Sequence, residues 1–198
     1  MVTADPAANI DAAIHVAHAF TVHGEEPEYD FFTVVDDLHE EGSGQGAADH
    51  LNESELVCGL FYGYVVVDRN TLLGNVDGDA ALAGEIVRRL VRVIATVSPG
   101  ARRGPTAPYG YASWMLAEAG DEQPRSLAEA FRTPAAPTRE DAHAKLNAHL
   151  ANVDRAYGSG NRRMALHIDG AETTGAGAAT TLDELAAFAA AAIAGASR

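Results

Sequence analysis

The stretch that decides the fold is 14–38, IHVAHAFTVHGEEPEYDFFTVVDDL. Its first part alternates, and one face carries Ile14, Val16, His18, Phe20 and Val22. Period two with β-branched and aromatic residues predicts a strand that lays one face on a core. The acidic turn at 24–28 contains a glycine and a proline, which block continuation of the strand. The apolar run at 30–38 follows this turn and ends with an acidic pair.

The composition indicates a folded and strongly acidic protein. Hydrophobic residues make up 47% of the 198 residues, so we expect a single domain over 1–198 with a sizeable core. The formal net charge of -14, taken alone, argues against binding of nucleic acid, because phosphate affinity depends on Lys and Arg. Net charge is an average, however, and a local groove can still be basic.

Two features that the sequence lacks bear on the cellular compartment of the protein. The chain has no apolar run of 18 residues, and its first residues lack the basic region and apolar core of a secretion signal. We therefore expect a cytoplasmic protein without a membrane partner. Cys58 is the only cysteine, which excludes an intrachain disulfide, and its apolar neighbours predict a small buried side chain.

The remaining elements are predicted from periodicity and turn residues. The apolar run 56–67 predicts a strand covered on both faces, so that residues 24–55 would form an arm between two strands. Helices are predicted at 79–97, 126–131, 138–156 and from 181 onward, further strands at 109–117 and 164–168, and a flexible linker at 170–180. The stripe of the helix at 79–97 consists of Leu82, Ile86, Leu90, Val93 and Ile94. Mixed helices and strands with an early hairpin predict an α+β sandwich.

Five segments follow one another in a characteristic order: AHAFTVH at 17–23, DFFTVVDDL at 30–38, His50-Leu51, LFYGY at 60–64 and SPGARR at 98–103. In this order they resemble the CasC family, the repeated backbone subunit of the type I-E CRISPR surveillance complex Cascade. The similarity extends from Met1 to about Gly120 and corresponds to about the latter half of a family member. We therefore expect a truncated form, in which Met1 aligns with a methionine that is internal in the family.

The resemblance implies both a fold and a function. The fold would be an incomplete ferredoxin-like (RRM-like) core, with an antiparallel sheet packed by helices and the arm at 24–55 as a "thumb" hairpin. The function would be that of a noncatalytic subunit binding CRISPR RNA in antiviral defence. Its partners would be CRISPR RNA, target DNA through the guide, further copies of itself in a filament and other Cascade subunits, and no cofactor is expected.

The resemblance also assigns a wedge that separates bases of the guide RNA. Phe32 aligns with the family's wedge aromatic, Phe31 and Thr33 flank it, Leu51 aligns with the leucine at the thumb tip, and Met1 aligns with a wedge methionine. An apolar side chain can replace a stacking partner of a base. From the local sequence alone, burial of Phe31 and Phe32 in a local cluster of an amphipathic strand is the favoured interpretation, and the matched order of DFFTVVDDL reverses this preference.

Candidate phosphate contacts are few. Arg102 and Arg103 lie in a Gly/Pro-rich loop after a helix, where guanidinium groups can bind phosphate in a bidentate way. Arg162 and Arg163 follow a Gly-Ser-Gly run and are weaker candidates. A solvated loop charge is the alternative interpretation of each.

Two other classes of function remain open. A small metal-dependent hydrolase would use His15, His18, Asp36 or Asp37. Alternation places His15 and His18 on opposite faces of a strand, and neighbouring strand residues such as Asp36 and Asp37 point apart, so we expect no metal there. An acidic scaffold that self-associates without RNA is the third hypothesis. It predicts oligomers that are indifferent to salt, unlike phosphate-driven binding.

Overall fold

The computed structural model describes residues 10–25, 28–34, 50–56, 58–98, 107–158, 160–170, 172–179 and 181–195. The strands are β1 (Ile14–Val16), β2 (Phe20–Thr21), β3 (Glu28–Val34), β4 (His50–Leu56), β5 (Phe61–Tyr62), β6 (Val65–Val67), β7 (Trp114–Ala119), β8 (Arg162–His167) and β9 (Gly177–Ala179). The helices are α1 (Arg69–Asn75), α2 (Ala80–Thr96), the 3-10 turn η2 (Ala128–Phe131), α4 (Arg139–Tyr157) and α5 (Leu182–Ala194). The α+β class predicted from the sequence is confirmed.

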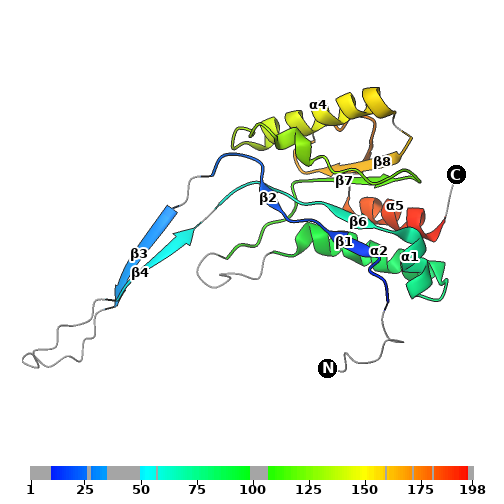
Figure 1. Ribbon diagram of the computed structural model, residues 1–198, viewed down its shortest axis with the longest axis horizontal. Helices are drawn as coiled ribbons and strands as arrows, with labels where there is room; N and C mark the ends of the chain where they lie inside the picture. Colours follow the sequence, from blue (N-terminus) through cyan, green and yellow to red (C-terminus); the bar gives the residue numbers. More distant parts are fainter. Residues whose placement is uncertain are drawn as a thin grey trace, which may run out of the picture.

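The strands form several small sheets rather than one large one. β1 pairs with β6, β2 with β5 and β3 with β4, each antiparallel. β7 and β8 are antiparallel, and β9 joins β8 in parallel to complete a three-stranded sheet. In Figure 1 this sheet lies between two helical layers, with α4 on one side and α5 with α2 on the other.

The alternation of residues along β7 and β8 explains the layers. Met115 and Ala117 face the core formed with α2 and α5, whereas Trp114 and Leu116 pack into the core beneath α4. A strand covered on both faces needs side chains that can be buried at every position. Polar side chains are nevertheless present on the α4 face, at the two ends of the β7–β8 pair, and these form the clusters described below.

Local capping signals set the helix boundaries. Thr138 caps α4 by accepting a hydrogen bond from the Asp141 amide, as its spacing predicts. Thr181 and Glu184 form the expected reciprocal capping box at the start of α5. Asp68 caps α1, a helix that the periodicity analysis did not predict. These caps depend only on residues two or three positions apart, which is why most of them are visible in the sequence.

The predicted first strand is interrupted. Its two halves, β1 and β2, pair with different partners, and the stripe is not uniformly buried, because Val16 is 73% exposed while Val22 is buried. The predicted strand at 56–67 is divided in the same way, with Gly59 and Gly63 in its gaps. Glycine weakens a strand interior, since it has no side chain to pack. The prediction that Cys58 is buried was wrong, because it is exposed between β4 and β5.

The predicted stripe of α2 was also partly wrong, although Ile86 does pack against the core. The buried face is shifted by one residue from the predicted stripe and consists of Ala83, Gly84, Val87, Val91 and Ala95. Three residues of the predicted stripe are exposed: Leu82, Val93 and Ile94. The reason is close helix–helix packing. A Cβ added at Gly84 would lie 3.2 Å from the carbonyl oxygen of Ala190 in α5. Small residues allow this approach, whereas the larger aliphatic side chains would hold the two helices apart.

The segment 170–180 differs from the predicted linker. It contains β9, and Thr173 within it is 8% exposed. The side-chain amide of Asn147 in α4 holds the segment, donating to the Glu172 carbonyl at 2.8 Å and accepting from the Thr174 amide at 3.2 Å. Long-range contacts thus give structure to a composition that is typical of linkers.

Candidate nucleic-acid interface and neighbouring polar clusters

The β3–β4 hairpin brings most of the sequence-predicted wedge residues together. The backbone of Phe31 pairs with Glu53, that of Phe32 with Asn52 and that of Thr33 with Leu51. The hairpin forms a two-stranded sheet of its own, and Figure 1 shows it extending away from the helices. Met1, Arg102, Arg103, Asp36 and Asp37 lie outside the described residues.

Aromatic side chains anchor the base of this hairpin. Phe20 of β2, Tyr62 of β5 and Phe131 of η2 form a ring cluster with centroid separations between 5.4 and 6.4 Å. The hydroxyl of Tyr62 also accepts a hydrogen bond from the Leu127 amide at 2.9 Å. β2 precedes the hairpin and β5 follows it, so this cluster fixes both chain segments that lead into β3 and out of β4.

The histidines of the hydrolase hypothesis do not form a site in the part of the chain that the structure describes. His15 lies in β1, whose backbone pairs with β6, and His18 follows β1. The nearby His23 has a structural role, since its Nε2 accepts from the Leu60 amide at 3.0 Å. Neither His15 nor His18 belongs to a group of three potential metal ligands within the described ranges.

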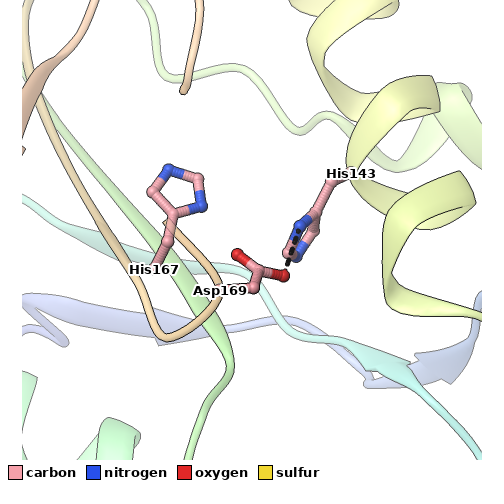
Figure 2. A group of neighbouring side chains, drawn as sticks. All are labelled: His143, His167 and Asp169. Carbon is pink, nitrogen blue, oxygen red and sulfur yellow. Dashed lines mark ion pairs between the residues drawn. The ribbon is translucent and has the colours of Figure 1, made fainter. Parts of the chain in front are cut away.

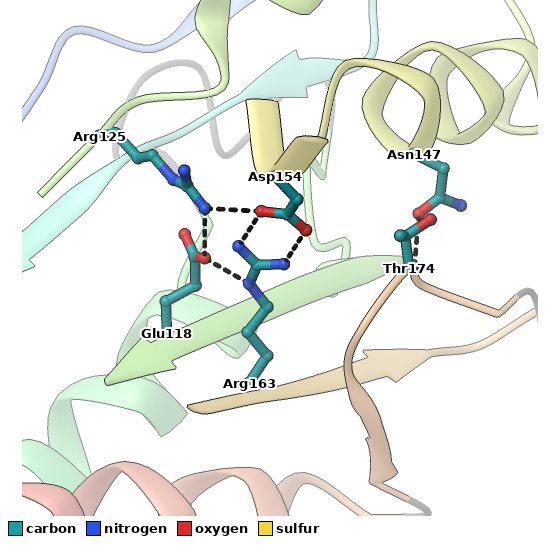
Figure 3. A network of polar contacts seen from close by, with 6 residues as sticks. All are labelled: Glu118, Arg125, Asn147, Asp154, Arg163 and Thr174. Atoms are coloured by element: carbon teal, nitrogen blue, oxygen red, sulfur yellow. Dashed lines mark hydrogen bonds and ion pairs between the residues drawn. The ribbon is translucent and has the colours of Figure 1, made fainter. Parts of the chain in front are cut away.

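One of the weaker phosphate candidates is buried in an ion-pair network (Figure 3). The side chain of Arg163 is 1% exposed and forms a bidentate pair with Asp154 of α4, at 2.5 and 2.7 Å. Its Nε also donates to Glu118 of β7 at 2.6 Å. Arg125 joins the network with 2.9 Å to Asp154. The interpretation of Arg163 as a phosphate contact was therefore wrong, whereas its neighbour Arg162 is exposed and lies 5.8 Å from the ring centroid of Phe188.

This network changes the acidity of its members. The hydrogen bonds from Arg163 hold the pKa of Asp154 below its usual value, against the opposing effect of burial, and Arg125 acts in the same direction. The same contacts raise the pKa of Arg163. The network is therefore charged at neutral pH and ties α4 to β7 and β8.

A second polar cluster lies under the other end of α4 and was missed by the sequence analysis (Figure 2). It consists of His143 of α4, His167 at the end of β8 and Asp169 just beyond it, with one ligand atom of each within 4.8 Å of the others. His143 is 7% exposed. Burial lowers the pKa of His167, and nearby His143 adds to this effect while Asp169 opposes it.

A signal for this cluster was present in the sequence. His143 stands beside Ala142 on the stripe that continues through Leu146 and Leu150, all buried in α4. A histidine on the apolar face of a helix has to be accommodated by a partner in the core. The sequence could not show that His167 and Asp169, more than twenty residues away, would supply the neighbouring groups.

Comparisons with known proteins agree with the fold. Two similar solved chains come from structures titled "CRISPR RNA-guided surveillance complex, pre-nicking" and "CRISPR RNA-guided surveillance complex". The first is 26% identical with a TM-score of 0.85, covering 98% of this chain and 53% of that one. The second is 27% identical with a TM-score of 0.82, covering 96% of this chain and 75% of that one. This chain thus spans about half the length of the first.

The search of curated proteins found no match. No helix within the described residues is long and apolar enough to cross a membrane. The family model described as "CT1975-like protein" matches residues 1–192, which confirms the resemblance identified in the sequence. The match extends over nearly the entire chain, and the protein accordingly belongs to the CT1975-like family.

Proposed function

We propose that this chain is a noncatalytic, CRISPR RNA-binding backbone subunit of a type I-E surveillance complex. The observation that carries the proposal is the family match over residues 1–192, together with structural similarity to two chains of CRISPR surveillance complexes. In such a subunit the guide reads sequence by base pairing, and the protein holds the strand and shapes it. The partners would be CRISPR RNA, target DNA through the guide, other copies of the chain and other Cascade subunits.

The proposed contact with RNA is the arm at 24–55, acting as a thumb. β3 and β4 pair only with each other among the described strands, so the hairpin is free of the three-stranded sheet. Phe32, flanked by Phe31 and Thr33, is the proposed wedge, and Leu51 lies opposite Thr33 in the ladder. Replacing one stacking partner of a base is worth about 1–3 kcal/mol per base. The aromatic anchor at β2 and β5 would keep such a wedge at a fixed position.

The charge of the chain limits how it would hold the RNA backbone. Several exposed arginines are already paired with acids: Arg89 with Glu85 at 2.7 Å, and Arg132 with Glu129 at 3.2 Å. Arg163 is buried in its own network. Arg102 and Arg103 are the proposed phosphate contacts, the exposed Arg162 is a weaker candidate, and Met1 is proposed as a second wedge residue. We expect neighbouring subunits to contribute further cationic groups, because the net charge of the chain is -14.

A binding experiment with a repeat–spacer RNA tests the wedge. We expect Phe32→Ala and Leu51→Ala to weaken binding or ordered assembly by about 5- to 150-fold each, which corresponds to roughly 1–3 kcal/mol. The matched control is Tyr157→Ala, since this aromatic is 82% exposed at the end of α4, away from the hairpin. Affinity should also fall steeply with added salt.

The outcomes separate the hypotheses. Equal affinity for Phe32→Ala, Leu51→Ala and the control would remove the wedge role but leave a backbone-binding role. Oligomers that form without RNA and are insensitive to salt would instead support the scaffold hypothesis and contradict RNA binding by this chain.

A further inference from the structure

We propose that His143, His167 and Asp169 bind a divalent transition metal ion, with zinc as the best fit, and that this ion ties the first half of α4 to the end of β8. The proposal does not depend on RNA binding. It concerns residues beneath α4, whereas the proposed wedge lies in the separate β3–β4 hairpin.

The donor set and its spacing suit such an ion. Two imidazoles and one carboxylate are a common combination at zinc sites, with metal–ligand distances of about 2.0–2.2 Å. Tetrahedral geometry at those distances separates neighbouring ligand atoms by roughly 3.3 Å. The three ligand atoms here already lie within 4.8 Å of one another, and Nδ1 of His143 is 3.3 Å from Oδ2 of Asp169.

Two buried nitrogen atoms in the cluster lack hydrogen bonds. Nδ1 of His143 and Nδ1 of His167 are both buried, and neither has a hydrogen-bond partner among the described residues. An unsatisfied buried polar group costs about 1–3 kcal/mol. The His143–Asp169 contact would become an ion pair only if the buried imidazole were protonated. A metal ion would instead use the lone pair of each Nδ1 and would neutralise the carboxylate.

Thr173 is compatible with the tautomer of His167 that a metal requires. Trp114 Nε1 can only donate, and it donates to Oγ1 of Thr173 at 3.0 Å. The same oxygen lies 2.7 Å from Nε2 of His167, so its second lone pair can accept the Nε2 proton. That arrangement leaves a lone pair on Nδ1. A ligating histidine commonly donates its other ring N–H to an oxygen in this way.

The surroundings hold the ligands in place. Asn147, one turn after His143 in α4, binds the backbone on both sides of Thr173. The rings of His143 and His167 lie edge to face, with centroids 5.7 Å apart. His143 and Trp114 also line a neighbouring cavity of about 140 Å³, which has room for water.

Titration of the chelator-treated full chain with Co²⁺, followed by displacement with Zn²⁺, tests the site. We expect one equivalent of Co²⁺ to give the visible spectrum of a tetrahedral complex. Thr173→Val should weaken binding by about 10- to 100-fold, and His143→Gln or His167→Gln should weaken it further. The control is His149→Gln, which removes another histidine of α4 that is outside the cluster and should leave binding unchanged.

A second measurement covers variants that fail to fold. In the unmodified chain, Zn²⁺ should shift the ¹⁵N resonances of Nδ1 in His143 and His167, whereas Mg²⁺ should shift neither. Retention of the Co²⁺ spectrum in both glutamine variants would overturn the proposal. Unchanged Nδ1 resonances at saturating Zn²⁺ would overturn it as well.

Discussion

Two polar clusters lie between α4 and the β7–β8–β9 sheet, and they differ in whether their acidic groups meet a permanently charged partner. Arg163 meets two carboxylates and fills the space under the C-terminal part of the helix (Figure 3). His143 and Asp154 are about 16 Å apart along α4, by the rise per residue of a helix. Nδ1 of His143 and Nδ1 of His167 are both buried without a hydrogen bond in the described structure, in the cluster of Figure 2. In the arginine network, Nε of Arg125 is buried without a hydrogen bond, but each carboxylate there meets a guanidinium group. A buried polar atom without a partner calls for an explanation, and a bound ion is one.

The largest expected effect is from Arg163→Ala. The substitution removes the bidentate partner of the largely buried Asp154 and the close partner of Glu118, and leaves Arg125 as the cation still in contact with both. Breaking a buried pair by removing one partner costs about 3–5 kcal/mol. The free energy of unfolding, measured by urea denaturation, should fall by that amount. Arg162→Ala is the matched control at the next position and should cost less than about 1 kcal/mol, because that side chain is exposed. Equal losses for the two variants would contradict the assignment of the network.

Leu150→Ala should have the next largest effect. Leu150 is 1% exposed and lies in α4 between the two clusters, so its truncation should cost about 3 kcal/mol by the same measurement. The control is Leu82→Ala in α2, which should cost less than about 1 kcal/mol because that leucine is 47% exposed. A larger loss at Leu82 than at Leu150 would show that the sequence-predicted stripe of α2 is the buried one.

The pH dependence of stability distinguishes the two clusters further. The pKa of Asp154 is lower in the folded chain than in the unfolded chain, so the unfolded chain binds the proton more tightly. The contribution of the Asp154 carboxylate to the free energy of unfolding is complete above the ordinary pKa of an aspartate. It is lost as the pH falls through the lowered pKa of the folded chain. Asp154→Asn should therefore flatten the acid limb of the stability profile and lower stability at neutral pH. An unchanged acid limb would mean that Asp154 does not carry the effect.

The smallest expected effect is from His143→Leu in metal-free protein. Removing a buried imidazole whose Nδ1 has no hydrogen bond should change the free energy of unfolding by no more than about 1 kcal/mol. The substitution should also abolish stabilisation by added Zn²⁺, which for the unmodified chain grows with the ratio of free ion to dissociation constant. A loss comparable to that of Arg163→Ala would show that the histidine cluster is satisfied without a metal.

Much of the fold could be predicted from sequence because its signals are local. The caps at Thr138 and Thr181 mark the starts of α4 and α5 within one turn of chain, and η2 was expected at its place. The proposed wedge residues come from family resemblance, and their role stays a prediction. The site beneath α4 could not be predicted, since His143 and Asp169 are brought together by packing between α4 and β8.

By itself, the sequence determined the helix starts, the α+β class and membership of the CT1975-like family. Only the tertiary structure decided which face of α2 is buried, which of two adjacent arginines is internal and which histidines meet. The physical reason is how far apart in the chain the interacting residues lie. A cap is a hydrogen bond between neighbours in the chain, whereas these choices depend on how closely distant helices and strands can pack.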